Sequence, residues 1–167
     1  ARSMASQQDS FSATSMLTIY IMSPCVAFDY YVEPASATQF GEYVFRFYYA
    51  IMHSLGSDIE PVSNVLKFVG VPEETNTYTI LYPFYHDFGL PGVGLFGGLY
   101  GAFYAFLYKR AQSGQNVYFI LYACFLNYLI LQFVQENILS NFSLNLQYVI
   151  LILFPYMFQQ LSSRLSR

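Results

Sequence analysis

The second half of the chain alternates between long uncharged stretches and short groups of charged residues. No Asp, Glu, Lys or Arg occurs in residues 88–108, 111–135 or 137–163. Each stretch can hold a helix of about 20 residues, the length that crosses about 30 Å of hydrocarbon. The pattern therefore predicts three membrane-spanning helices, near 88–108, 117–135 and 143–160.

The basic residues at the ends of these stretches predict an orientation. Lys109 and Arg110 follow the first predicted span, and Arg164 and Arg167 follow the third. The positive-inside rule places such residues in the cytoplasm, together with the C-terminus. Residues 1–87 then form a periplasmic loop region, and residues 88–167 form a three-helix transmembrane region.

The first half of the chain is less apolar and is expected to be partly helical. Residues 10–28 lack charge but contain several Ser and Thr residues, which favours a helix at the membrane interface over a span. The aromatic stretch 40–55 predicts a second helix. Gly and Pro residues make 56–80 mainly loop, with a short helix near 62–69. The predicted fold class is an all-α polytopic membrane helical bundle, preceded by a partly helical outer loop.

Composition agrees with a membrane protein and argues against several other classes. The chain is 55% hydrophobic and 10% charged, whereas soluble domains carry about 25% charged residues. Disordered chains are rich in charge, so disorder is also disfavoured. A net charge of −3 disfavours nucleic acid as a partner. Membrane lipids are the expected surroundings.

Two features suggest that more helices precede this chain. The predicted outer region, 1–87, has no signal-peptide pattern that would export it. The pairs Gly94/Gly98 and Gly97/Gly101 form two overlapping GxxxG motifs, which let another helix approach closely. We therefore expect a C-terminal fragment whose partners include missing N-terminal helices of the same protein. The alternatives are a removed targeting segment and glycines without a packing role.

The segment 75–92 is the strongest candidate for a functional site. It leads into the first predicted span, whose N-terminus would face outward and would suit an anion such as a lipid-linked phosphate. Gly89 and Gly92 would let a ligand approach the backbone. No spacing of His, Cys, Asp or Glu matches a metal motif, so neither a metal nor a cofactor is expected.

Side chains in and near this segment carry suitable chemistry, although each has a simpler interpretation. Asp87 could cap the following helix. The tyrosines could form an interfacial aromatic belt, and Arg46 could stack on aromatic rings. If the protein acts at the membrane surface, His86 and Asp87 would lie within reach of a substrate held there and could exchange a proton with it. Sugar rings and hydroxyls could contact Tyr78, Tyr82, Tyr85, Asn76 and Thr79.

Residues 76–101, NTYTILYPFYHDFGLPGVGLFGGLYG, resemble a known family. They are similar to the bacterial oligosaccharide repeat-unit polymerases, the Wzy-type O-antigen and capsule polymerases. In that family an Asn-x-Tyr-Thr segment precedes an aromatic stretch, an Asp-Phe-Gly sequence and a glycine-rich transmembrane helix. The matching residues here are Asn76, Tyr78, Thr79, Tyr85, Asp87, Phe88, Gly89 and Gly92.

The resemblance implies a multi-pass enzyme of the bacterial inner membrane. Such a glycosyltransferase moves a growing glycan from one undecaprenyl pyrophosphate onto another lipid-linked repeat unit, at the periplasmic face. It implies no metal and no nucleotide sugar, and a chain-length regulator is a further candidate partner. On this hypothesis Arg46 and Arg2 bind pyrophosphate, and Asp87 or His86 orients or deprotonates the acceptor. The remaining substrate-binding candidates are Asn76, Tyr78, Thr79, Tyr85 and Gly89.

Two other functions stay open at this point. A flippase or transporter for lipid-linked glycans would place charged residues inside its helices, and the three predicted spans contain none. A non-catalytic membrane subunit would explain the glycine motifs but not the polar segment 75–87.

Overall fold

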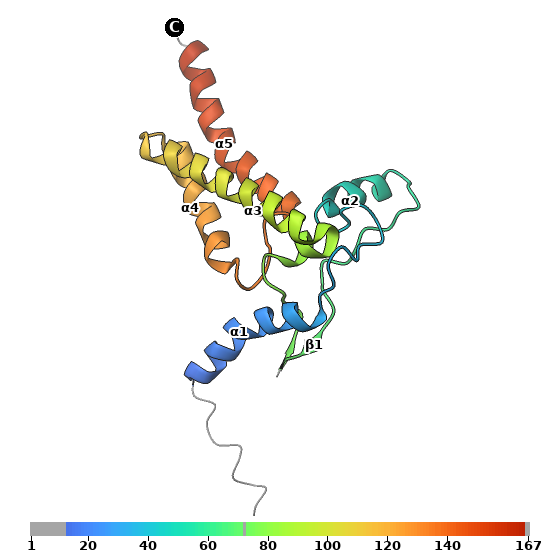
Figure 1. Cartoon of the computed structure of the whole chain (residues 1–167). Coiled ribbons are helices and arrows are strands. Elements are labelled where there is room, and N and C mark those ends of the chain that lie inside the picture. The colour runs from blue at the N-terminus through green and yellow to red at the C-terminus, as the bar shows by residue number, and fades with distance from the viewer. Residues whose placement is uncertain (1–12, 72, 166–167) are drawn as a thin grey trace, which may run out of the picture.

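A computed structural model describes residues 13–71 and 73–165. This part of the chain is mainly helical, with one small antiparallel hairpin in which Val69 lies opposite Thr75 (Figure 1). The elements are α1 (Ala13–Tyr31), α2 (Arg46–Ser54), β1 (Val69–Gly70), β2 (Glu74–Thr75), α3 (Tyr82–Gln112), α4 (Asn116–Leu131) and α5 (Phe142–Leu165).

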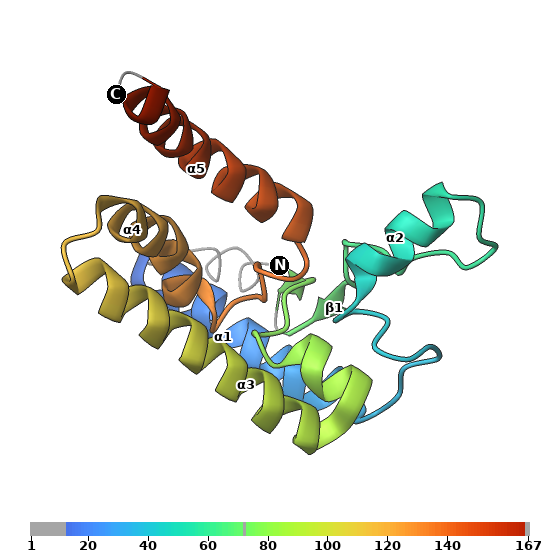
Figure 2. The same ribbon diagram turned by 90° about the horizontal axis from the view of Figure 1, so that it is seen from above.

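Helices α3 and α4 form a hairpin with its own apolar core. Tyr104 and Leu107 of α3 are buried against Leu121 and Phe125 of α4. The Tyr104 hydroxyl also donates a hydrogen bond of 3.0 Å to the Phe125 carbonyl. Figure 2 shows the two helices side by side, with α5 following a separate course.

All three predicted spans are helical, but their bounds differ from the prediction. Among the described helices, α3 alone is long and apolar enough to cross a membrane; α4 and the apolar part of α5, Phe142–Tyr156, are shorter. Helix α4 stops at Leu131 instead of residue 135. The chain leaves the helix there because the Gln132 carbonyl accepts a hydrogen bond of 2.8 Å from the Ile80 backbone N–H, and Gln135 forms a bridge with Thr79.

Helix α3 is broken at Gly89, where the sequence predicted the start of one continuous helix. The backbone angles of this residue are φ 65° and ψ −154°, a combination open almost only to glycine. Because the helix breaks at Gly89, the carbonyl groups of the preceding turn have no backbone N–H partners within the helix. Backbone N–H groups of Ala35 and Ser36 replace them, donating to the carbonyls of Tyr85 at 3.0 Å and His86 at 2.8 Å.

The break folds the first segment of α3, residues 82–88, back over the start of the long segment. A Cβ added to Gly92 would lie 2.5 Å from the Phe84 carbonyl oxygen, so only glycine fits at this approach. Residues 82–88 thereby become a separate short helix that faces the loop of residues 33–45 (Figure 2).

The glycine-rich face of α3 is open in the described part of the chain. No atom of another segment lies within 4 Å of where a Cβ would stand on Gly94, Gly97, Gly98 or Gly101. Helix α4 therefore packs on another face of α3.

Helix α1 confirms the helix predicted over 10–28 from residue 13 onward, and residues 10–12 lie outside the described part of the chain. The helix packs on the hairpin. Ala27 is fully buried against Val69 and Tyr78. The Ser23 hydroxyl donates a hydrogen bond of 2.8 Å to the Val71 carbonyl. This contact fixes the hairpin beside the helix.

Two predictions for the outer region are wrong in detail. The helix predicted over 40–55 begins only at Arg46, because residues 40–45 form turns with Gly41 at φ 62°. The short helix predicted near 62–69 is absent from this described segment. Two backbone carbonyls that would accept hydrogen bonds inside a helix accept them from side chains instead. Arg46 Nε donates to the Val62 carbonyl at 2.8 Å, and the Tyr78 hydroxyl donates to the Lys67 carbonyl at 2.7 Å.

Candidate functional site

The site is built where the short helical segment 82–88 meets the turns of residues 38–45. Asp87 joins them. Its side chain is completely buried, and Oδ2 accepts hydrogen bonds from the backbone N–H groups of Tyr43 at 3.0 Å and Val44 at 2.9 Å. The interpretation of Asp87 as the cap of its own helix is therefore wrong. Its carboxylate stabilises a turn more than 40 residues away, through charge-assisted hydrogen bonds.

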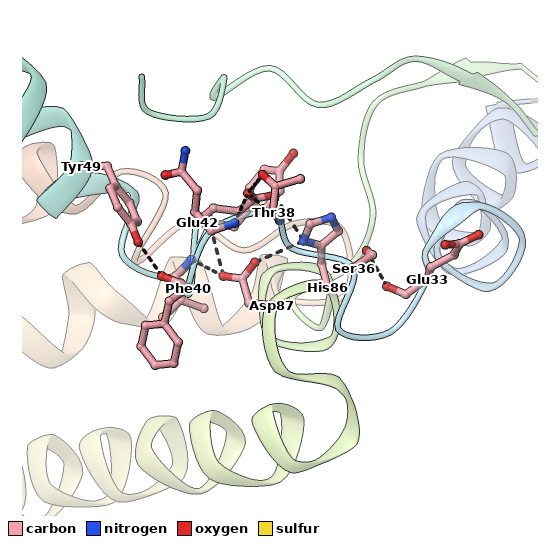
Figure 3. A network of polar contacts seen from close by, with 11 residues as sticks. Glu33, Ser36, Thr38, Phe40, Glu42, Tyr49, His86 and Asp87 are labelled. Atoms are coloured by element: carbon pink, nitrogen blue, oxygen red, sulfur yellow. Dashed lines mark hydrogen bonds and ion pairs between the residues drawn. The ribbon is translucent and has the colours of Figure 1, made fainter. Parts of the chain in front are cut away.

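The second oxygen of Asp87 orients His86. Oδ1 lies 3.1 Å from His86 Nδ1 (Figure 3). A carboxylate only accepts hydrogen bonds, so the proton of a neutral imidazole is assigned to Nδ1. Nε2 then carries the lone pair, and it has no hydrogen-bond partner among the described residues. This is the tautomer that a general base needs when a carboxylate holds the other ring nitrogen.

Glu42 places a second buried carboxylate beside the same imidazole. Its Oε1 lies 3.8 Å from His86 Nδ1, and its side chain is 9% exposed. Its Oε2 accepts hydrogen bonds from the Thr38 backbone N–H at 3.1 Å, the Thr38 hydroxyl at 2.7 Å and the Gln39 backbone N–H at 3.2 Å. Glu42 was not among the residues predicted for the site, although it is the one acidic residue in the aromatic stretch 40–55.

The three side chains also form an arrangement that a cation could occupy. Ligand atoms of Glu42, His86 and Asp87 all lie within 4.8 Å of one another. Two carboxylates and an imidazole suit a divalent metal ion chemically. These residues form no recognisable metal motif in the sequence, because Glu42 comes from a different segment of the chain.

A cavity of about 480 Å³ adjoins His86. The rings of Tyr43 and Tyr82 pack against the imidazole, with centroid distances of 4.9 and 5.5 Å. The cavity, called the His86 cavity below, is lined by Tyr31, Glu33, Ser36, Tyr43, Lys67, Phe68, Val69, Tyr78, Tyr82 and His86.

A much smaller cavity of about 30 Å³, the Arg46 cavity, adjoins the His86 cavity at two shared tyrosines. Tyr43 and Tyr82 line both cavities, and their ring centroids are 5.0 Å apart. The other lining residues are Arg46, Ser63, Asn64, Leu66, Thr79, Pro83, Gln135, Glu136 and Ser140. The two cavities therefore adjoin at this pair of aromatic rings.

Arg46 is the cation of this cavity, and its terminal nitrogens are available to a ligand. Nε donates to the Val62 carbonyl, and no carboxylate within the described ranges forms an ion pair with the guanidinium. Glu136 also lines the cavity, but its oxygens are already occupied. Oε1 accepts from the Tyr100 hydroxyl at 2.6 Å and from two backbone N–H groups, and Oε2 accepts from the Ser140 N–H at 2.8 Å. No carboxylate of the described residues therefore competes with an anionic ligand for the Arg46 guanidinium.

The segment before α3 contributes Tyr78 and Thr79. Thr79 has φ 42°, a rare conformation for a β-branched residue, and such strain is concentrated at functional sites. Its side chain is buried, and the hydroxyl accepts a hydrogen bond from the Leu81 N–H at 3.3 Å. Burial raises the pKa of the Tyr78 phenol above its ordinary value, so this side chain lines the His86 cavity as a neutral group.

Other candidate residues lie away from the two cavities. The Tyr85 ring packs on Phe28 of α1, with centroids 5.3 Å apart. Gly89 is buried beneath Pro34 and Ala35, which leaves no room for a ligand on its backbone. Asn76 lines a third cavity, and Arg2 lies outside the described residues. The structure thus brings together Arg46, Tyr78, Thr79, His86 and Asp87.

Comparison with known proteins identifies one family. Residues 8–135 match the model of a family described as "Putative O-antigen polymerase". The match covers most of the chain and includes both segments that build the site. No curated protein and no solved structure matches the chain.

Proposed function

Because the chain belongs to the O-antigen polymerase family, we propose that it polymerises lipid-linked oligosaccharide repeat units into O-antigen or capsular polysaccharide. The donor in this proposal is the growing glycan on undecaprenyl pyrophosphate, and the acceptor is another lipid-linked repeat unit. The reaction takes place at the periplasmic face of the inner membrane, where both substrates are held by their lipids.

The proposed topology places the site on that face. In this topology residues 1–87 lie outside, α3 crosses the membrane, the shorter apolar helices α4 and α5 provide the second and third crossings, and the C-terminus is cytoplasmic. Two features support this. The end of α4 contacts residues 79–80 through Gln132 and Gln135, so the outer loop and the α4–α5 connection share one side. Lys109 and Arg110 lie in the last turn of α3, at the opposite end of that helix.

In the proposed reaction, His86 and Arg46 of the two adjoining cavities have different roles. His86 Nε2 takes the proton of the acceptor hydroxyl while the oxygen attacks the anomeric carbon of the donor sugar. The bond between that carbon and the pyrophosphate oxygen breaks, and the pyrophosphate leaves with the bonding electrons. The guanidinium of Arg46 stabilises the charge that develops on the leaving group. Arg2 is a candidate second cation.

The carboxylates act on the imidazole and not on the substrate. Asp87 holds Nδ1–H at 3.1 Å and stabilises the imidazolium formed on proton transfer. Glu42, at 3.8 Å from the same nitrogen, adds a second negative charge. Tyr78 and Thr79 are placed to contact sugars in the two cavities, whereas Tyr85 and Gly89 position the segment that carries His86.

One observation carries this proposal: a candidate base and an unpaired cation line adjoining cavities that share Tyr43 and Tyr82. Glycosyl transfer from a pyrophosphate donor needs a base for the acceptor and a cation for the leaving group at neighbouring positions.

The test is to replace His86 by Gln and Arg46 by Gln in the full-length protein, in cells that lack the native copy. We expect single repeat units in place of the polysaccharide ladder on a gel. His53→Gln is the matched control, since His53 is exposed on α2. A normal ladder from both His86→Gln and Arg46→Gln would contradict the proposed site.

The same cells separate the polymerase from a flippase. Loss of a polymerase leaves lipid-linked repeat units at the outer face, whereas loss of a flippase keeps them at the inner face. Repeat units trapped inside would favour the transporter alternative, and a full-length ladder with altered complex assembly would favour a non-catalytic subunit.

A further inference from the structure

The segment of residues 75–79 passes three cavities in order. Thr75, Asn76 and Thr77 line the third cavity, Tyr78 lines the His86 cavity and Thr79 lines the Arg46 cavity. The three cavities therefore border one continuous segment of five residues. The pairing of Val69 with Thr75 places the His86 cavity and the third cavity beside the same hairpin.

The third cavity lies between α1 and residues 73–77 and measures about 530 Å³. Its apolar wall comes from α1 and includes Tyr20, which is 61% exposed. Its polar wall includes Asn76, whose half-buried amide has no hydrogen-bond partner among the described residues.

The chemistry of this cavity differs from that of the Arg46 cavity. Glu73 and Glu74 line it, and no Lys or Arg is among its described lining residues. It is therefore unsuited to a phosphate. An aromatic ring opposite amide, hydroxyl and carboxylate groups matches a sugar, whose C–H face is apolar and whose edge carries hydroxyls.

We propose that the third cavity is a glycan subsite for the acceptor repeat unit. It holds the sugars that follow the reacting one, with Tyr20 against a sugar face and Asn76 on its hydroxyls. The proposal rests on the proposed function, which places the reacting hydroxyl at His86. In the proposed function the donor pyrophosphate lies against Arg46, near one end of the segment, so the acceptor chain extends past Tyr78 toward the other end.

The experiment compares two soluble acceptors with the purified full-length protein and the lipid-linked donor. One acceptor is a glycoside of the terminal sugar alone, and the other is the complete repeat-unit oligosaccharide. For Tyr20→Ala and Asn76→Ala we expect KM for the complete acceptor to rise about fivefold, the effect of one lost contact of this kind. KM for the single sugar and kcat for both acceptors stay unchanged. Tyr30→Ala is the control, because Tyr30 is an exposed tyrosine of the same helix that does not line the cavity.

Two results would overturn the subsite. One is an unchanged KM for the complete acceptor. The other is an equal change for both acceptors, which would mean that Tyr20 and Asn76 support the fold or bind a lipid. If Tyr20→Ala does not fold, Asn76→Ala alone decides the test, since it changes a side chain without intramolecular hydrogen bonds in the described structure. Failure of the proposed function is a separate outcome, recognised by normal transfer to both acceptors from His86→Gln.

Discussion

The α3–α4 hairpin and the outer site are stabilised in different ways. In the hairpin, buried apolar side chains such as Leu107 and Phe125 lie on neighbouring helices joined by a short loop. In the outer site, the buried groups are the carboxylates of Glu42 and Asp87, and backbone N–H groups satisfy them. Burying a charge costs free energy unless it is hydrogen-bonded. The comparison shows that apolar burial builds the scaffold, whereas paired polar groups build the place where chemistry can occur.

The largest expected effect comes from removing the carboxylate that joins the two segments of the site. Asp87→Ala leaves the N–H groups of Tyr43 and Val44 without their acceptor and frees His86. We expect loss of polymer and a decrease of about 2–4 kcal/mol in the free energy of unfolding, from two buried donors left unpaired. The measurements are the polysaccharide ladder and thermal unfolding in detergent.

Tyr104→Phe is the matched change in the hairpin. It removes one buried hydrogen bond to the Phe125 carbonyl, which is worth about 1 kcal/mol, and it should leave the ladder unchanged. A normal ladder from Asp87→Ala, or loss of polymer from Tyr104→Phe, would contradict the different roles assigned to the outer site and the hairpin.

These differences explain which features could be predicted from the sequence. The helices of the hairpin follow from local hydropathy, which is why the positions of all three predicted spans are helical. His86 and Asp87 were found because they stand beside an apolar stretch. Glu42 was missed because its role depends on a contact with residue 86, and nothing in residues 40–55 encodes that distance.

The sequence around residue 89 contains a signal for the break in α3. Gly89 precedes Leu90-Pro91-Gly92, and a proline favours the first turn of a helix. The sequence analysis took these glycines as points of ligand approach. In the structure Gly89 ends the short helical segment and Gly92 allows close packing on Phe84.

The next effect concerns the charge of Glu42. Glu42→Gln keeps the size of the side chain and removes a negative charge 3.8 Å from His86 Nδ1. We expect kcat to fall about tenfold, the effect of about 1.4 kcal/mol less stabilisation of the imidazolium in the transition state, with KM unchanged. Glu33→Gln is the control, since Glu33 lines the His86 cavity but forms no ion pair or hydrogen bond with the imidazole. Equal effects of the two changes would mean that only the total charge matters.

Two glycines of α3 should respond in opposite directions to the same substitution. Gly89→Ala places a side chain at φ 65° and should decrease the free energy of unfolding by about 1–3 kcal/mol. Gly97→Ala, at a helical position with nothing within 4 Å, should increase helix stability by about 0.5–1 kcal/mol. Thermal unfolding of both variants measures the difference. A stable Gly89→Ala protein would show that the break does not require glycine.

The smallest expected effect is that of a chelator. In the proposed mechanism a proton, and not a metal ion, lies between His86 and the two carboxylates. EDTA should therefore change the rate of repeat-unit transfer by less than about twofold. Loss of activity in EDTA, with recovery on adding Mn²⁺ or Mg²⁺, would instead assign Glu42, His86 and Asp87 to a metal site.

The most direct test of the central claim is the rate of repeat-unit transfer by the purified full-length protein with His86→Gln. The account predicts a rate at least about 100-fold below that of the unchanged protein, because the general base is lost, with normal binding of the lipid-linked donor at Arg46. A His86→Gln protein that transfers repeat units at the rate of the His53→Gln control would contradict the account.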